Sequence, residues 1–197
     1  MTKYIIAVKI DDDPQNPRDD DNTGTMVCFH KRYTLGDTHD YKESDYSGWD
    51  ELEKAIVREH DPAVILPLCL YDHSSVTIST IPFSCPFDSG QIGFIYISKK
   101  RVCFEYGVKH MLPRTVDLAR GALCSEVEAY DQYLRGDTWG YTISDEFGEE
   151  YDSCWGFFGE EYCREEAERV VAALEKRDAE RQQELIRAQA AMPCCLP

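Results

Sequence analysis

The fold is decided by residues 67–99, which read PLCLYDHSSVTISTIPFSCPFDSGQIGFIYISK. Val, Ile, Thr, Phe and Tyr dominate short runs in this stretch, and two polar segments, 72–75 and 82–91, separate the runs. Thr77 and Ser79 alternate with apolar neighbours, a pattern typical of a strand that exposes one face to water. We therefore expect residues 67–99 to form the central part of an antiparallel sheet.

Hydrophobic periodicity extends this prediction along the chain. Strands are expected at 3–10, 25–30, 63–71, 76–81, 92–98, 138–143 and 150–157, and helices at 51–60, 99–106, 113–134 and 159–192. The predicted fold class is therefore α+β, with a largely antiparallel sheet of about six or seven strands, three or four helices and a long C-terminal helix. Residues 1–158 are expected to form the core domain, and residues 159–197 a charged helix and tail.

Local signals refine three of these elements. The Asp-rich segment 11–24 is expected to be a solvated hairpin connection between the first two strands. Asp50 is expected to be the N-cap residue of the first helix, because Glu53 follows it at capping-box spacing. Pro67 lies inside a predicted strand and therefore indicates a bulge or a sheet-edge position.

The chain of 197 residues is strongly acidic, with a formal net charge of −16. Such a charge repels a phosphate backbone and disfavours direct nucleic-acid binding. It suits a basic protein surface, including one that normally holds DNA or RNA. The alternative is that the acidic residues only confer solubility.

The nine cysteines are an odd number, and no secretory leader precedes the first strand. This combination argues against a disulfide framework. No segment reaches the ~18 apolar residues that a membrane span needs. We therefore expect a reducing cytoplasm as the compartment and no membrane association.

Carboxylates cluster at residues 11–13, 19–21, 37–50 and 145–168. Those of the last region alternate with aromatic residues in DEFGEEYDSCWGFFGEEY, residues 145–162. Aromatic anchors among acids are typical of a surface that enters a basic protein groove. The residues expected to contact a partner are Asp11, Asp12, Asp13, Asp19, Asp20, Asp21, Glu149, Glu150, Tyr151, Asp152, Trp155, Glu160 and Glu161. The alternative is a solvated hairpin that packs through its aromatic residues onto the final helix.

An enzymatic or metal-binding function is the second class of hypothesis. Its candidate residues are His30, His39, Asp72, His73 and Cys85. The paired spacings of zinc sites are absent. His73 and Cys85 flank one predicted strand and would lie roughly 20 Å apart if it is straight, so a Cys–His pair is disfavoured. We therefore expect no metal, no cofactor and no catalytic residues, although these five residues leave the question open.

Four segments carry a family resemblance. They are DNTGTMVCFHKRYTLGD (21–37), LPLCLYDHSSVTISTIPFSCPFDSGQIGFIYISKK (66–100), EVEAYDQYLRGDTWGYTI (126–143) and DSCWGFFG (152–159). Together they resemble a family of conserved, uncharacterised proteins that bacteriophages and other mobile elements encode. The resemblance implies a phage origin and an accessory function, and it transfers no catalytic residue.

Charge and resemblance together predict a non-enzymatic phage accessory protein in the host cytoplasm. Its expected partner is a host protein with a basic nucleic-acid-binding groove, in a defence complex of the CRISPR–Cas kind, which it would inhibit as a nucleic-acid mimic. A third hypothesis is a scaffolding protein that forms a homodimer through the C-terminal helix.

Overall fold

The computed structural model describes residues 2–73, 75–85 and 87–191, and this part of the chain has four α-helices and seven β-strands. The elements are β1 (Ile5–Ile10), β2 (Thr25–Cys28), α1 (Trp49–His60), β3 (Pro62–Asp72), β4 (Val76–Ser79), β5 (Ser89–Ser98), α2 (Lys99–Glu105), α3 (Pro113–Leu134), β6 (Thr138–Ser144), β7 (Glu150–Phe158) and α4 (Glu160–Ala191). All strand pairs are antiparallel, and the predicted α+β class is confirmed. The strands divide into two sheets, however, and not one.

The chain forms two compact units. One unit comprises the residues up to Pro14 together with those from Gly136 onward, and the other comprises Gln15–Arg135. This division differs from the predicted one between residues 158 and 159. The reason is that α4 packs against β1, β6 and β7, so the C-terminal helix belongs with the first and last strands.

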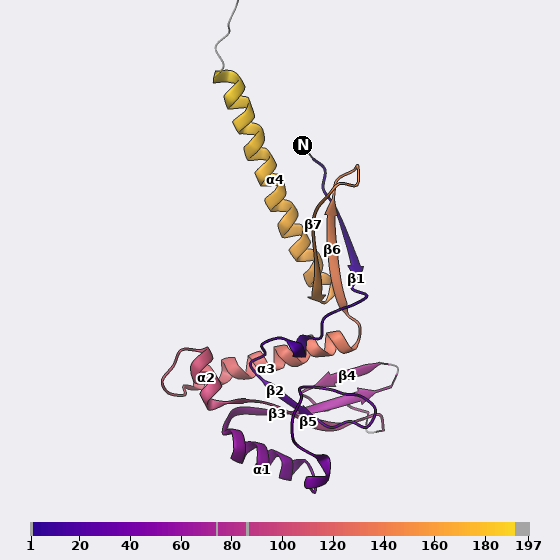
Figure 1. Cartoon of the computed structure of the whole chain (residues 1–197), viewed down its shortest axis with the longest axis vertical. Coiled ribbons are helices and arrows are strands. Elements are labelled where there is room, and N and C mark those ends of the chain that lie inside the picture. The colour runs from indigo at the N-terminus through magenta and orange to yellow at the C-terminus, as the bar shows by residue number, and fades with distance from the viewer. Residues whose placement is uncertain (1, 74, 86, 192–197) are drawn as a thin grey trace, which may run out of the picture. The chain divides into compact units, whose positions relative to one another are not determined.

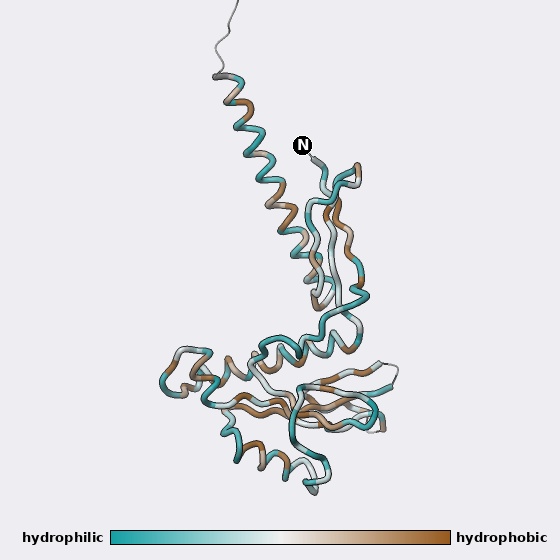
Figure 2. The backbone as a smooth tube through the Cα atoms, in the orientation of Figure 1, coloured by the Kyte–Doolittle hydropathy of each residue, from teal (hydrophilic) through white to brown (hydrophobic). Residues whose placement is uncertain are grey.

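Unit 15–135 is a four-stranded sheet, in the order β2-β5-β3-β4, with helices on both faces. Apolar residues of α3 cover one face, and Leu52 and Ile56 of α1 cover the other (Figure 1). Figure 2 shows the apolar residues concentrated along β3 and β5, at the middle of this sheet. The prediction that residues 67–99 form the centre of a sheet is therefore confirmed for β3 and β5, whereas β4, which lies in the same stretch, is an edge strand.

The predicted hairpin between the first two strands is wrong. β1 pairs with β6, and β2 pairs with β5, so the two strands lie in different sheets. The connecting segment is also only partly solvated, because a 3₁₀ turn at Pro17–Asp19 buries Pro17 and Arg18. The Asp-rich composition indicated a loop correctly but did not indicate which strands the loop joins.

Helix ends follow local chemistry. α3 ends at Leu134, as predicted, and begins at Pro113 itself, because proline suits the first helical position and a buried face follows at helical spacing. The predicted N-cap of α1 is wrong, since Gly48 occupies that position and Asp50 lies inside the helix. The Glu51 carboxylate accepts hydrogen bonds from the Ser47 backbone N–H and hydroxyl, and so anchors the chain entering the helix.

The other unit is a three-stranded sheet, in the order β1-β6-β7, with the first half of α4 on one face. Cys163, Ala167 and Leu174 of the helix pack against Tyr141 and Ile143 of β6. The helix then continues beyond the strands (Figure 1). Its residues 180–189 are exposed. Among the described residues, no helix combines the length and apolar character that a membrane span requires.

Candidate functional site

The predicted acidic surface centres on residues 145–162, which we call the acidic segment. It comprises the β6–β7 turn, the edge strand β7 and the start of α4. Asp145 is buried and shapes the turn, because its carboxylate accepts hydrogen bonds from the Phe147 and Glu149 backbone N–H groups, each at 2.9 Å. The other carboxylates of the turn point away from the core and are exposed.

Most of these exposed carboxylates have no basic partner. Within the described part of the chain, no ion pair involves Glu146, Glu149, Glu150 or Glu161, whereas Glu160 pairs with Arg164 one helical turn away. Four negative charges are therefore fully available to a partner.

Aromatic rings interrupt this row of acids. The Trp155 ring lies over Gly140, where a Cβ atom would come within 2.1 Å of it, and the residue is still 47% exposed. Tyr151 packs edge-on against Tyr4 with ring centroids 5.1 Å apart, and Phe147 at the turn is 87% exposed. Trp155 and Tyr151 are thus held in place by glycine or aromatic neighbours while presenting apolar area, as anchors of an interface do.

The predicted acids of the N-terminal region fall into two groups. Asp11, Asp12 and Asp13 follow β1 and belong to the same unit as the acidic segment, and the Asp11 N–H donates to the Thr138 carbonyl. Residues 19–21 belong to unit 15–135, where Asp21 pairs with Arg101 at 3.1 Å. The predicted set is therefore divided between the two units.

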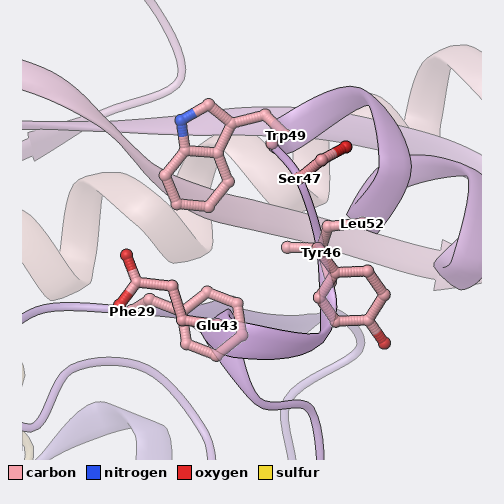
Figure 3. A pocket seen from close by; sticks show the side chains of 7 residues that line it. Phe29, Glu43, Tyr46, Ser47, Trp49 and Leu52 are labelled. Carbon is pink, nitrogen blue, oxygen red and sulfur yellow. The ribbon is translucent and has the colours of Figure 1, made fainter.

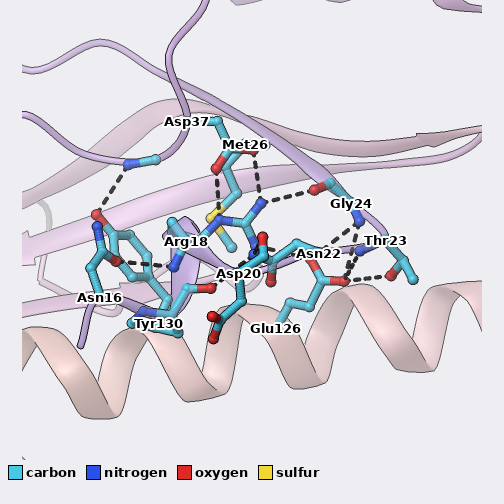
Figure 4. Close-up of polar contacts among 12 residues, drawn as sticks. Asn16, Arg18, Asp20, Asn22, Thr23, Gly24, Met26, Asp37, Glu126 and Tyr130 are labelled. Atoms are coloured by element: carbon cyan, nitrogen blue, oxygen red, sulfur yellow. Dashed lines mark hydrogen bonds and ion pairs between the residues drawn. The ribbon is translucent and has the colours of Figure 1, made fainter. Parts of the chain in front are cut away.

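A buried ion network, which the sequence analysis missed, ties the Asp-rich segment to α3 (Figure 4). The Arg18 side chain is 2% exposed and donates to both carboxylate oxygens of Asp37 at 2.8 Å and to Glu126 at 2.9 Å. Glu126 also accepts hydrogen bonds from the Thr23 N–H and hydroxyl. Burial lowers the pKa of Arg18, but the hydrogen bonds to Asp37 and Glu126 outweigh this effect and raise it.

The five residues of the enzyme hypothesis do not converge. His39 Nε2 lies 3.1 Å from the Cys28 carbonyl oxygen, Asp72 pairs with Arg32, and the Cys85 thiol donates to Asp88 at 3.7 Å. His30 and Asp72 line one common cavity. Across the described residues, no group of three or more His, Cys, Asp or Glu side chains is arranged to hold a metal ion.

A cavity beside the N-terminus of α1 is the second feature that the sequence analysis missed (Figure 3). It is lined by Phe29, Glu43, Tyr46, Ser47, Gly48, Trp49 and Leu52. The sequence held one signal of it, since the long irregular segment 31–50 is unusually rich in aromatic residues for a loop. The aromatic residues of this segment follow no helical or strand periodicity, so the sequence did not indicate that Tyr46 and Trp49 line one cavity with Phe29.

Comparison of the chain with protein-family models, with curated proteins and with solved structures finds no match.

Proposed function

We propose that the protein is a non-enzymatic binding protein whose acidic segment enters a basic, nucleic-acid-binding groove of a partner. The observation that carries the proposal is the row of exposed carboxylates of residues 145–162, of which all but Glu160 lack an ion-pair partner among the described residues. Trp155 and Tyr151 interrupt this row. Carboxylates compete with phosphates for Lys and Arg, and fixed aromatic rings add contact area that charge alone does not supply.

The most specific form of the proposal names the partner. Resemblance to proteins of bacteriophages and mobile elements supports a host defence complex that targets nucleic acids, such as a CRISPR–Cas effector, and inhibition as the outcome. In this form the protein acts in the host cytoplasm and leaves nucleic acid itself unbound, because its own net charge of −16 repels phosphates.

Charge reversal tests the proposal. The variant Glu149→Lys/Glu150→Lys/Glu160→Lys/Glu161→Lys should lose inhibition of nucleic-acid cleavage by the effector complex. The wild-type affinity should fall by about tenfold or more between about 50 and about 300 mM salt, as expected for charge-steered binding. The matched control is Glu168→Lys/Glu175→Lys/Glu180→Lys/Glu184→Lys, which changes the net charge equally at exposed positions of α4.

The two variants distinguish the hypothesis that the acidic segment contacts a partner from the alternative that its acidic residues only confer solubility. If the acidic segment binds, only the first variant loses inhibition, and both remain folded by circular dichroism. Equal inhibition by the first variant and the wild type would overturn the proposal.

A further inference from the structure

The cavity beside α1 has the composition of a cation site and lies in unit 15–135, apart in sequence from the acidic segment. We call it the aromatic box and define it by Phe29, Tyr46, Trp49, Glu43 and Leu52 (Figure 3). Its volume is about 230 Å³, which accommodates one small functional group and the start of its carbon chain. The buried Leu52 belongs to the core beneath it.

The rings of the box are fixed before any ligand arrives. The planes of Phe29 and Trp49 are inclined by 26°, with centroids 6.4 Å apart. Phe94 contacts Trp49 edge-on at 6.4 Å, and His39 contacts Phe29 edge-on at 5.2 Å. Two nearly parallel rings, each in contact with a further aromatic side chain, favour a flat group that stacks on ring faces.

The polar groups of the box favour positive charge. The carboxylate of Glu43 is exposed and forms no ion pair in the described part of the chain. No Lys or Arg is among the residues that line the cavity, although Lys31 and Arg32 line an adjoining cavity that shares Phe29, Glu43 and Trp49 with it. The hydrogen-bond donors of Ser47 are occupied by Glu51, at 2.7 and 2.8 Å, so they are not available to an anion. Ring faces add a negative quadrupole that attracts cations.

The N-terminus of α1 opposes this preference but does not reverse it. A helix N-terminus carries roughly half a positive charge, whereas Glu43, Asp45, Asp50 and Glu51 place four carboxylates in the adjoining turns. The pKa of Tyr46 is raised, by burial first and then by Glu59 and Asp45, with Arg58 acting in the opposite direction. Glu59 and Asp45 thus place negative charge around the Tyr46 hydroxyl, which points away from the box in Figure 3.

We propose that the aromatic box binds a guanidinium group, which stacks on Phe29 and Trp49 and donates paired hydrogen bonds to the Glu43 carboxylate. A guanidinium is flat, is weakly hydrated and matches a carboxylate with two parallel N–H groups, whereas an ammonium is a compact point charge. The group belongs either to an arginine side chain of a protein partner or to a small guanidino compound. The inference stands independently of the acidic segment.

Titration of the ¹⁵N-labelled full chain with ethylguanidinium, and in parallel with ethylammonium, tests the inference by NMR. Ethylguanidinium should shift the Trp49 indole N–H and the backbone resonances of residues 29, 43 and 46–49, with a Kd on the order of millimolar for so small a ligand. Ethylammonium should bind at least about fivefold more weakly. Glu43→Gln should weaken ethylguanidinium binding about tenfold or more, since it removes a charge-assisted hydrogen bond.

The control is Glu53→Gln, which removes one negative charge from α1 outside the box and should leave the affinity unchanged within about twofold. The Glu43→Gln variant should remain folded, because the Glu43 side chain is exposed. Trp49→Leu is a poorer test, since Trp49 packs against the core and its removal would disturb the fold. N-acetyl-arginine amide and a peptide with one arginine between glycines distinguish the sources, because tighter binding of the peptide identifies a protein partner and equal binding a small compound. Equal shifts by both ethyl probes, or an affinity that Glu43→Gln leaves unchanged, would overturn the inference.

Discussion

At the scale of single residues, one buried charge organises much of unit 15–135. Arg18 holds Asp37 and Glu126 together, and their carboxylates in turn accept the N–H groups of Met26 and Thr23 (Figure 4). A buried ion pair adds little relative to apolar residues of the same size, but removing one partner leaves uncompensated charge in a low dielectric. The network therefore specifies where the segments around residues 18 and 37 lie.

Replacing the guanidinium measures that role. Arg18→Met should lower the free energy of unfolding by about 3–5 kcal/mol, because two carboxylates lose their partner inside the protein. Lys99→Met is the control: its pair with Asp61 spans 2.7 Å but both side chains are at least half exposed, so the cost should stay below about 1 kcal/mol. Urea denaturation of both variants gives the comparison, and equal costs would contradict a structural role for the network.

A second residue-scale effect concerns alkaline pH. Burial, and then the charge of Asp37, raises the pKa of the Cys28 thiol to about 12. In the unfolded chain the thiol ionises near pH 8.5. Between these values the unfolded state has lost a proton that the folded state keeps, so the thiol's contribution to stability declines by about 1.4 kcal/mol per pH unit as pH rises.

Cys28→Ala should therefore have a lower free energy of unfolding than the wild type at pH 7. This difference should shrink as pH rises from about 8.5 to about 10.5, because only the wild type has the buried thiol. Denaturation midpoints of wild type and variant across this range provide the measurement. Cys124→Ala, which removes an exposed thiol, is the control and should run parallel to the wild type. A constant difference between Cys28→Ala and wild type would show that the buried thiol is not linked to alkaline unfolding.

At the scale of elements, local signals predicted whether a segment forms a helix or a strand, but not which other elements it pairs or packs with. Pro113 and a buried face at helical spacing determine α3, and these features lie within 22 residues. β1 pairs with β6, more than 120 residues away, and no local pattern names that partner. The site follows the same rule: the acidic segment is continuous in sequence, whereas Arg18, Asp37 and Glu126 meet only through the fold.

The two halves of α4 differ in what they contact, which a matched pair of leucines can test. Leu174 is 9% exposed in the core of its sheet, whereas Leu185 is 52% exposed. Leu174→Ala should cost about 2–4 kcal/mol, and Leu185→Ala less than about 0.5 kcal/mol, in chemical denaturation. A large cost for Leu185→Ala that grows with protein concentration would instead support the scaffolding hypothesis, in which this half of the helix forms a dimer.

At the scale of the whole molecule, each compact unit has its own hydrophobic core. The two clusters on the faces of the four-stranded sheet contain only residues of unit 15–135, and the third cluster contains only residues of the other unit. About 120 residues with a complete core suffice for an independent domain. The other unit is discontinuous in sequence, because its sheet needs both β1 and β6.

Two truncations therefore have opposite expected outcomes. A fragment of residues 15–135 should fold alone and unfold cooperatively in urea, because it keeps both faces of its sheet covered. A fragment of residues 1–158, cut at the boundary that the sequence predicted, should lose the fold of β1, β6 and β7, since removing α4 exposes Tyr141 and Ile143 to water. Dispersed ¹⁵N–¹H NMR spectra distinguish the outcomes residue by residue. A disordered 15–135 fragment would mean that this unit depends on the other one for its fold. An intact β1–β6 pairing in the 1–158 fragment would mean that the domain boundary lies between residues 158 and 159, as the sequence predicted.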